Sequence, residues 1–359
     1  MNKYESLMSE VISLAEKGRG FTSPNPLVGS IIYDEENDSI EGRGFHVFSG
    51  GPHAEVNAIQ DAILRQGSVE GKTLITNLEP CCHRNKKTPP CTELILKHGL
   101  RKVIIGCVDP NNSVAGKGVK FLRENGVEVV SGILADESKA LNEVYYHTQK
   151  NKRPFLSIKI GTSLDGKISL LGGESKYITS DESRDVVHDL RFFHDAILVG
   201  LGTVIKDDPI LNIRRGSFKN FNKRLKTIVV GRLKGFDFKV YKLFNSQKNV
   251  IFLNVGDDVC EDSFPFIVRN CRENLSLAIN NLINDDIYSV LVEPGAKILR
   301  ELLKIGYCDK LYIHQSTSVI GKGLSFSDGI EISSLADRIK INSSSVKKVG
   351  VDIHIEGYL

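Results

Sequence analysis

The chain has 359 residues, of which 41% are hydrophobic and 25% are charged, so it is long enough for about two globular domains with a core each. The 47 Lys and Arg residues nearly balance the 44 Asp and Glu residues, which leaves a net charge of +3. This balance argues against a protein built mainly to hold a nucleic-acid backbone, but it is compatible with local basic pockets for a phosphorylated metabolite.

The first twenty residues predict an amphipathic helix that ends at Gly18 or Gly20. Glu5, Glu10 and Glu16 interrupt its apolar pattern and exclude a signal-peptide core. No later run approaches the roughly 20 apolar residues of a membrane span. We therefore expect a cytoplasmic protein in a reducing compartment, whose seven cysteines are metal ligands or buried residues rather than disulfide partners.

From residue 28 to residue 150, strand-like segments alternate with helix-like segments. Buried apolar runs predict strands over 28–33, 73–78, 103–108 and 127–130. Periodic patterns, some opened by Pro or closed by Gly, predict helices over 53–65, 91–98, 117–125 and 136–150. This alternation indicates a layered α/β domain with a largely parallel sheet.

The short polar stretch over 151–154 contains a proline and is the best linker candidate. It divides the chain into expected domains over 1–150 and 151–359. The second part repeats the α/β pattern, with strands expected over 155–160, 196–199, 227–230, 250–253, 289–292, 310–314 and 346–355. Helices are expected over 180–193, 274–283 and 296–305.

The strongest chemical signal in the first part combines one histidine, two cysteines and a glutamate. His53 and Cys91 each follow a proline at a predicted helix start, and Cys81 follows a proline after a strand. Imidazole and thiolate suit Zn²⁺, and three protein ligands leave the fourth tetrahedral position to water, as in catalytic sites. Glu55 would carry a proton from that water to departing ammonia. Cys82 is the alternative ligand, and we favour Cys81 because it directly follows the proline.

In the second part, 292–299 has the pattern of a strand, a glycine turn and a helix, the arrangement that presents backbone N–H groups to phosphate. The segment 157–169 is a strand that turns at Asp165 and Gly166. By themselves, such turns more often connect elements than bind a ligand.

Four segments of the first part resemble the cytidine-deaminase superfamily: NPLVG (25–29), GRGFHVFSGGPHAE (42–55), LEPCCH (78–83) and TPPC (88–91). TPPC is the most specific of them and resembles the bifunctional deaminase-reductases of riboflavin biosynthesis. Four later segments resemble the reductase domain of the same family: GESKYITS (173–180), DLR (189–191), GTVIKDDPILNIR (202–214) and VEPGAKIL (292–299). The resemblance covers nearly the whole chain.

The resemblance implies a cytidine-deaminase-like three-layer α/β domain followed by a dihydrofolate-reductase-like α/β domain. It implies zinc-dependent hydrolytic deamination of 2,5-diamino-6-(5-phosphoribosylamino)pyrimidin-4-one. NADPH-dependent reduction of the ribosyl group would follow and give 5-amino-6-(5-phosphoribitylamino)uracil. The partners would be these small molecules rather than nucleic acid or membrane.

The resemblance also implies roles for individual residues. Zinc would be held by His53, Cys81 and Cys91, with Glu55 as acid and base. The deaminase substrate would be bound by Asn25, His46, Lys87 and Thr88. NADPH would contact Gly161 or Thr162, Tyr177, Thr203, Asp207 and the turn formed by Gly295, Ala296, Lys297, Ile298, Leu299, Arg300 and Glu301. The reductase substrate would contact Lys159, Ser175, Arg191, Leu211, Arg214 and Glu293.

Two other classes of protein fit part of this pattern. A tRNA or nucleoside deaminase joined to an unrelated C-terminal domain would share the zinc ligands, but TPPC and the near-neutral charge speak against it. A non-catalytic zinc-binding scaffold would usually take a fourth protein ligand and would have no need of Glu55. The sequence leaves open the oligomeric state, and whether the intermediate passes directly between the two sites.

Overall fold

The computed structural model describes residues 2–82, 89–111, 115–175, 177–221, 223, 225–247, 249–272 and 274–359. The chain separates into two compact units, Met1–Lys152 and Arg153–Leu359. This division falls inside the polar stretch 151–154 that marks the linker in the sequence. No helix in the described ranges has both the length and the apolar character needed to cross a bilayer.

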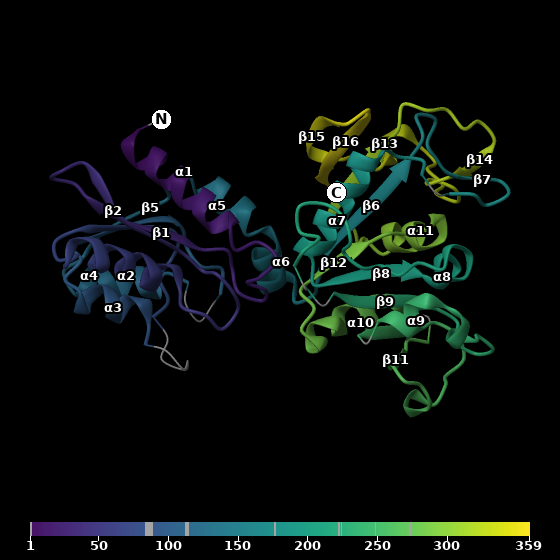
Figure 1. The fold of residues 1–359 in the computed structure, drawn as a ribbon, viewed down its shortest axis with the longest axis horizontal. Coiled ribbons are helices and arrows are strands. Elements are labelled where there is room, and N and C mark those ends of the chain that lie inside the picture. The colour runs from purple at the N-terminus through teal and green to yellow at the C-terminus, as the bar shows by residue number, and fades with distance from the viewer. Residues whose placement is uncertain are drawn as a thin grey trace. The chain divides into compact units, whose positions relative to one another are not determined.

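A five-stranded sheet forms the centre of the first unit (Figure 1). In the order β2-β1-β3-β4-β5, it contains β2 (Ser39–Phe45), β1 (Gly29–Asp34), β3 (Thr73–Leu78), β4 (Lys102–Cys107) and β5 (Glu128–Ser131). Strands β3, β4 and β5 are parallel, whereas β1 is antiparallel to both β2 and β3. The sheet of this unit is therefore mixed: β1 runs opposite to the other four strands, so the expectation of a largely parallel sheet holds for strand direction but not for the two pairings of β1.

The strand that the hydrophobic pattern did not reveal is β2. Its Gly42 and Gly44 lie against a helix so closely that a Cβ atom would come within 2.4 and 2.3 Å of the backbone of Ala58. Glycine at these positions removes the apolar alternation by which strands are recognised.

Helices cover both faces of this sheet (Figure 1). One face packs against α1 (Lys3–Glu16) and α5 (Ala135–Leu141), and the other against α2 (Ala54–Gln66), α3 (Cys91–Lys97) and α4 (Lys117–Glu124). Alternate residues of each strand point to opposite faces. Thus Ile31 joins the core under α1, while Ile32 joins the core under α2. The expected three-layer domain is confirmed.

The helix expected over 136–150 is two helices, α5 and α6 (Glu143–Asn151). They are separated at Asn142, whose φ of −104° and ψ of 27° are not helical. The Asn142 side chain accepts the Leu27 N–H at 2.7 Å and donates to the Leu27 carbonyl at 2.9 Å. Because the helix is interrupted by a contact with a residue far away in the sequence, helical periodicity alone does not reveal the break.

The second unit has a nine-stranded sheet in the order β11-β10-β9-β8-β12-β6-β13-β16-β15. Its strands are β6 (Phe155–Thr162), β8 (Ala196–Gly200), β9 (Lys226–Gly231), β10 (Val250–Asn254), β11 (Ile267–Asn270), β12 (Ser289–Val292), β13 (Lys310–Gln315), β15 (Asn342–Val349) and β16 (Asp352–Tyr358). The pairings from β11 to β13 are parallel, and only β13-β16 and β16-β15 are antiparallel. A two-stranded sheet pairs β7 (Lys167–Leu170) with β14 (Gly323–Ser325).

The helices of the second unit lie on both faces of the large sheet. They are α7 (Asp181–Phe193), α8 (Leu201–Asp207), α9 (Lys242–Ser246), α10 (Leu275–Asn280) and α11 (Ala296–Lys304), with 3₁₀ turns at Phe238–Val240, Glu261–Ser263, Asn281–Asp285 and Leu335–Asp337. One core contains side chains of α10 and α11, and another contains side chains of α8 and α9. Strands β8 and β12 are parallel neighbours, and each leads into a helix at the same edge of the sheet.

Candidate active sites

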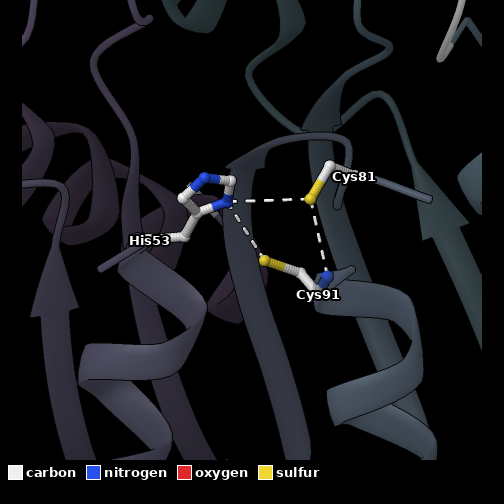
Figure 2. A group of neighbouring side chains, drawn as sticks. All are labelled: His53, Cys81 and Cys91. Atoms are coloured by element: carbon white, nitrogen blue, oxygen red, sulfur yellow. Dashed lines mark hydrogen bonds between the residues drawn. The ribbon is translucent and has the colours of Figure 1, made fainter. Parts of the chain in front are cut away.

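One imidazole and two thiols come together in the first unit (Figure 2). His53 is the residue before α2, Cys81 follows β3, and Cys91 is the first residue of α3. A strand end and the starts of two helices therefore converge on one point. Helix N-termini favour the thiolate form of a nearby cysteine, which is the form that binds metal.

The spacing of the three donor atoms fits a tetrahedral cation. His53 Nδ1 lies 3.2 Å from Cys91 Sγ and 3.7 Å from Cys81 Sγ, and all three donors lie within 4.8 Å of one another. Zn–S bonds of about 2.3 Å and Zn–N bonds of about 2.0 Å in a tetrahedron place donors about 3.5 to 3.8 Å apart. These residues could hold Zn²⁺ with only small movements.

The interactions of the Cys81 and Cys91 thiols also favour a metal site. Hydrogen bonds from the Cys91 thiol and from His53 lower the pKa of Cys81, despite its burial. The resulting thiolate and the buried surroundings raise the pKa of Cys91 well above its usual value. A bound divalent cation would stabilise both groups as thiolates.

Glu55 lies in the first turn of α2, beside these donors, and is only 3% exposed. Burial raises the pKa of its carboxyl above the usual value, and the Cys81 charge adds to this, while His53 opposes it. A carboxyl with a raised pKa suits a residue that acts in turn as base and acid. Cys82, by contrast, lies outside the group of donors and burial raises its pKa.

Two further predicted residues connect to the group of donors. His46 is 3% exposed, and its Nδ1–H donates to the Pro52 carbonyl at 2.9 Å. Its Nε2 is then an acceptor for the Asn25 Nδ2–H at 3.1 Å. The His46 and His53 rings meet edge to face, with centroids 5.7 Å apart. Lys87 and Thr88, the other expected substrate residues, lie outside the described residues.

A cavity of ≈ 1460 Å³ opens in the second unit at the carboxyl ends of its parallel strands, where open α/β sheets bind their ligands. Most residues expected to bind cofactor or substrate line it: Lys159, Gly161, Ser175, Tyr177, Arg191, Thr203, Asp207, Leu211, Glu293, Gly295, Ala296, Lys297, Ile298, Arg300 and Glu301. The N-terminal turn of α11 borders the cavity, so its free backbone N–H groups could bind a pyrophosphate. The cavity is large enough for a dinucleotide and a second ligand.

Three charged residues that line this cavity form an ion cluster. Arg191 donates to both carboxylate oxygens of Glu293, at 2.7 and 3.2 Å, and Lys159 Nζ lies 3.3 Å from the same carboxylate. Burial alone would raise the pKa of Glu293, but Arg191 and Lys159 hold it well below its usual range. Burial and the charge of Arg191 lower the pKa of the adjacent His188 to about 4, so this imidazole is neutral at neutral pH.

Three expected residues do not line the cavity. Thr162 is 1% exposed, and its hydroxyl donates to the carbonyls of Ser163 and Lys167; Gly161 is the one that borders the cavity. Leu299 is on the core-facing side of α11 and is 2% exposed. Arg214 is exposed beside the cavity, where its guanidinium donates to Asn212 Oδ1 at 3.0 Å.

The sequence interpretation missed Arg232, which follows β9 and lines the cavity. Its side chain is exposed and has no hydrogen-bond or ion-pair partner in the described part of the chain. The sequence signal for Arg232 is its position directly after a buried strand, at the edge of the sheet where such folds bind their ligands.

Both units match protein families. Residues 1–107 match the cytidine and deoxycytidylate deaminase zinc-binding region, and residues 154–355 match the RibD C-terminal domain. The riboflavin biosynthesis protein RibD of Aquifex aeolicus is 34% identical over 355 residues, which are 98% of this chain and 97% of the relative. RibD of Escherichia coli is 31% identical over 98% of this chain and 99% of its own.

Solved structures agree over the full length. A diaminohydroxyphosphoribosylaminopyrimidine deaminase/5-amino-6-(5-phosphoribosylamino)uracil reductase from Thermotoga maritima is 36% identical, with a TM-score of 0.88. The alignment covers 99% of this chain and 98% of that chain. Acinetobacter baumannii RibD has a TM-score of 0.87 at 29% identity, with the same coverage.

Proposed function

The chain belongs to the RibD family of bifunctional deaminase-reductases of riboflavin biosynthesis, and on this premise we propose the two reactions that it catalyses. The first is hydrolytic deamination of 2,5-diamino-6-(5-phosphoribosylamino)pyrimidin-4-one with Zn²⁺. The second is reduction of the ribosyl group with NADPH, to give 5-amino-6-(5-phosphoribitylamino)uracil. The match over 154–355 removes the alternative of a deaminase joined to an unrelated C-terminal domain.

In the deamination, His53, Cys81 and Cys91 would hold the zinc ion, whose Lewis acidity makes a water molecule acidic near neutral pH. Glu55 would accept a proton of that water, whose oxygen would bond to the ring carbon that carries the amino group. Glu55 would then pass the proton to the amino group, which leaves as ammonia. Asn25 and His46 would orient the pyrimidine. Because both are hydrogen-bonded to each other beside His53, the substrate would meet a site that is already ordered.

In the reduction, NADPH would supply a hydride to C1′ of the ribosyl group, while the bond from C1′ to the ring oxygen opens and that oxygen takes up a proton from solvent. The α11 turn would bind the pyrophosphate through backbone N–H groups. Lys159, Arg191 and Glu293, which line the same cavity, would bind the phosphoribosyl substrate. Arginine suits this role because its planar guanidinium can hold two oxygens at once.

The observation that carries this proposal is that one chain combines the donor group beside Glu55 with a dinucleotide-sized cavity lined by the expected residues. The test is ammonia release from the phosphoribosyl diaminopyrimidine, compared with release from cytidine and from tRNA. NADPH oxidation with the deaminated intermediate is the second arm. Faster ammonia release from cytidine or tRNA would contradict the first reaction. NADPH absorbance that does not fall when the deaminated intermediate is added would contradict the second.

A further inference from the structure

Two buried asparagines in the first unit hold the backbone of one short segment. Asn142 accepts the Leu27 N–H at 2.7 Å and donates to the Leu27 carbonyl at 2.9 Å. Asn77 donates to the same carbonyl at 3.0 Å and accepts the Gly29 N–H at 2.8 Å. The two side chains are 0% and 3% exposed. We call this four-bond arrangement of Asn77 and Asn142 the Leu27 clamp.

The clamp occupies positions at which asparagine is poorly suited to the local structure. Asn77 lies inside the buried strand β3, where asparagine is normally depleted. Asn142 interrupts what would otherwise be a continuous helix from α5 to α6. Buried amides stabilise a fold only when their hydrogen bonds are satisfied. Here those bonds converge on a single three-residue stretch, which makes its position very well determined.

That stretch is connected to the deaminase site by a short chain of contacts. Leu27 is two residues from Asn25, and prolines at 24 and 26 restrict the backbone on either side of Asn25. Asn25 donates to His46, which donates to the carbonyl of Pro52, the residue before the donor His53. In addition, β3 carries Asn77 and continues through two residues to Cys81. The clamp therefore ties Asn25 to the strand that supplies a metal ligand.

We propose that Asn77 and Asn142 are positioning residues of the deaminase, which act by holding Asn25 in place to receive the pyrimidine. Asn25 is exposed and its Oδ1 has no hydrogen-bond partner among the described residues. A carboxamide held in this way can pair with an N–H group on the edge of a pyrimidine ring. The inference rests on the proposed deamination and adds the residues that fix its substrate contact.

The test uses the full-length protein loaded with zinc. Asn142→Ala should raise the KM for the diaminopyrimidine nucleotide about 10-fold or more, with kcat changed less than about 3-fold. Zinc content and reduction of the deaminated intermediate should stay unchanged. Asn125→Ala is the matched control, because Asn125 Nδ2 makes a similar 2.8 Å bond to a backbone carbonyl on the surface. Asn142→Asp is the second variant, because it keeps the shape but cannot donate to the Leu27 carbonyl.

A double-mutant cycle then asks whether Asn142 acts through Asn25. In an Asn25→Ala background, Asn142→Ala should raise KM little further, because the contact it positions is already gone. Fully additive effects on KM would overturn the proposal. Loss of zinc or of folded protein in both Asn142 variants would also overturn it, because the clamp would then be purely structural.

A last measurement does not depend on the substrate. Amide hydrogen exchange at Leu27 should accelerate in Asn142→Ala and stay slow in Asn125→Ala. If the wild-type protein failed to deaminate the nucleotide while this exchange behaved as expected, the proposed function would fail and the clamp would stand. Unaltered exchange at Leu27 would overturn the clamp itself.

Discussion

Glu55 is the residue whose replacement should best separate metal binding from proton transfer. Glu55→Gln keeps the size and hydrogen bonding of the side chain but removes the group that accepts the proton. Deamination should fall by about 10²- to 10⁴-fold, the usual contribution of a positioned acid or base. Elemental analysis should still show zinc, and reduction of the supplied intermediate should be unaffected. Loss of both activities in a folded, zinc-loaded variant would contradict the assignment of separate sites.

The adjacent cysteines at 81 and 82 provide a matched pair for the metal. Cys81→Ala and Cys91→Ser should lose zinc and deamination, because each removes one of three donors that lie within 4.8 Å of one another. Cys82→Ala should retain both, because Cys82 lies outside this group. Elemental analysis of the purified variants measures the difference. Zinc retained in Cys81→Ala but lost in Cys82→Ala would reverse the assignment.

At the scale of residues, the sequence predicted best where the chemistry is carried by residue type. Imidazole, thiol and carboxyl side chains can be recognised from residue type alone, so the set of metal donors at His53 could be predicted before any fold was known. The choice between Gly161 and Thr162 was not, because it depends on which side of β6 faces the cavity. Arg232 was also missed, because its role follows from its place at the edge of the sheet.

At the scale of elements, we expect the residue that follows β9 to determine whether the protein prefers NADPH or NADH. The end of β9 lies two strands from that of β12, which leads to α11, so the two strand ends are about 10 Å apart. An arginine near the adenosine ribose accommodates the 2′-phosphate that distinguishes NADPH from NADH. Arg232→Ala should raise the KM for NADPH about 10-fold, with little change for NADH.

The control for this change is Lys234→Ala. Lys234 lies two residues further along the same loop and pairs with Asp257 at 3.1 Å. Steady-state kinetics with both cofactors measures the ratio of the two KM values. An equal loss with NADPH and NADH would show that Arg232 does not recognise the 2′-phosphate.

Elements were predictable where their own residues determine them. The long buried strands of both units and helices such as α7 and α11 carry clear periodicity. The short elements β7, β11, β14, α8 and α9 were not predicted. Two other errors occurred where a neighbour determines the element. The glycines that allow α2 to pack closely against β2 also remove the apolar alternation typical of a strand. Asn142 interrupts the helix between α5 and α6 because its side chain is hydrogen-bonded to Leu27. The strand expected over 346–355 is the hairpin β15–β16, which turns at Gly350 with a φ of +59°.

At the scale of the whole molecule, stability should fall in mild acid because of a histidine buried in the second unit. His194 donates to the Leu190 carbonyl at 2.7 Å and accepts from Ser157 Oγ at 2.8 Å. Burial lowers its pKa from 6.5 to about 4, so the unfolded chain binds a proton that the folded chain does not. The neutral His194 therefore stabilises the folded state fully above about pH 6.5. As the pH falls toward 4, this stabilisation is lost and the free energy of unfolding decreases by roughly 3 kcal/mol.

His194→Gln should flatten this dependence, because the amide can make both hydrogen bonds without titrating. Melting temperatures measured between about pH 7 and pH 5 should fall less steeply than in the wild type. His98→Gln, in the half-buried turn after α3 of the first unit, is the control. Equal slopes in His194→Gln and the wild type would show that this imidazole does not govern acid stability.

If this single chain carries out both reactions in order, its products from the first substrate should depend on NADPH. Purified, zinc-loaded protein is incubated with 2,5-diamino-6-(5-phosphoribosylamino)pyrimidin-4-one, with and without NADPH, and the products are identified by mass spectrometry. Without NADPH, we expect a product in which one amino group has been replaced by oxygen. With NADPH, we expect the same product with two further hydrogens, the ribityl compound. Recovery of unchanged starting material, or a product that stays deaminated but unreduced when NADPH is present, would contradict the assignment of both reactions to this chain.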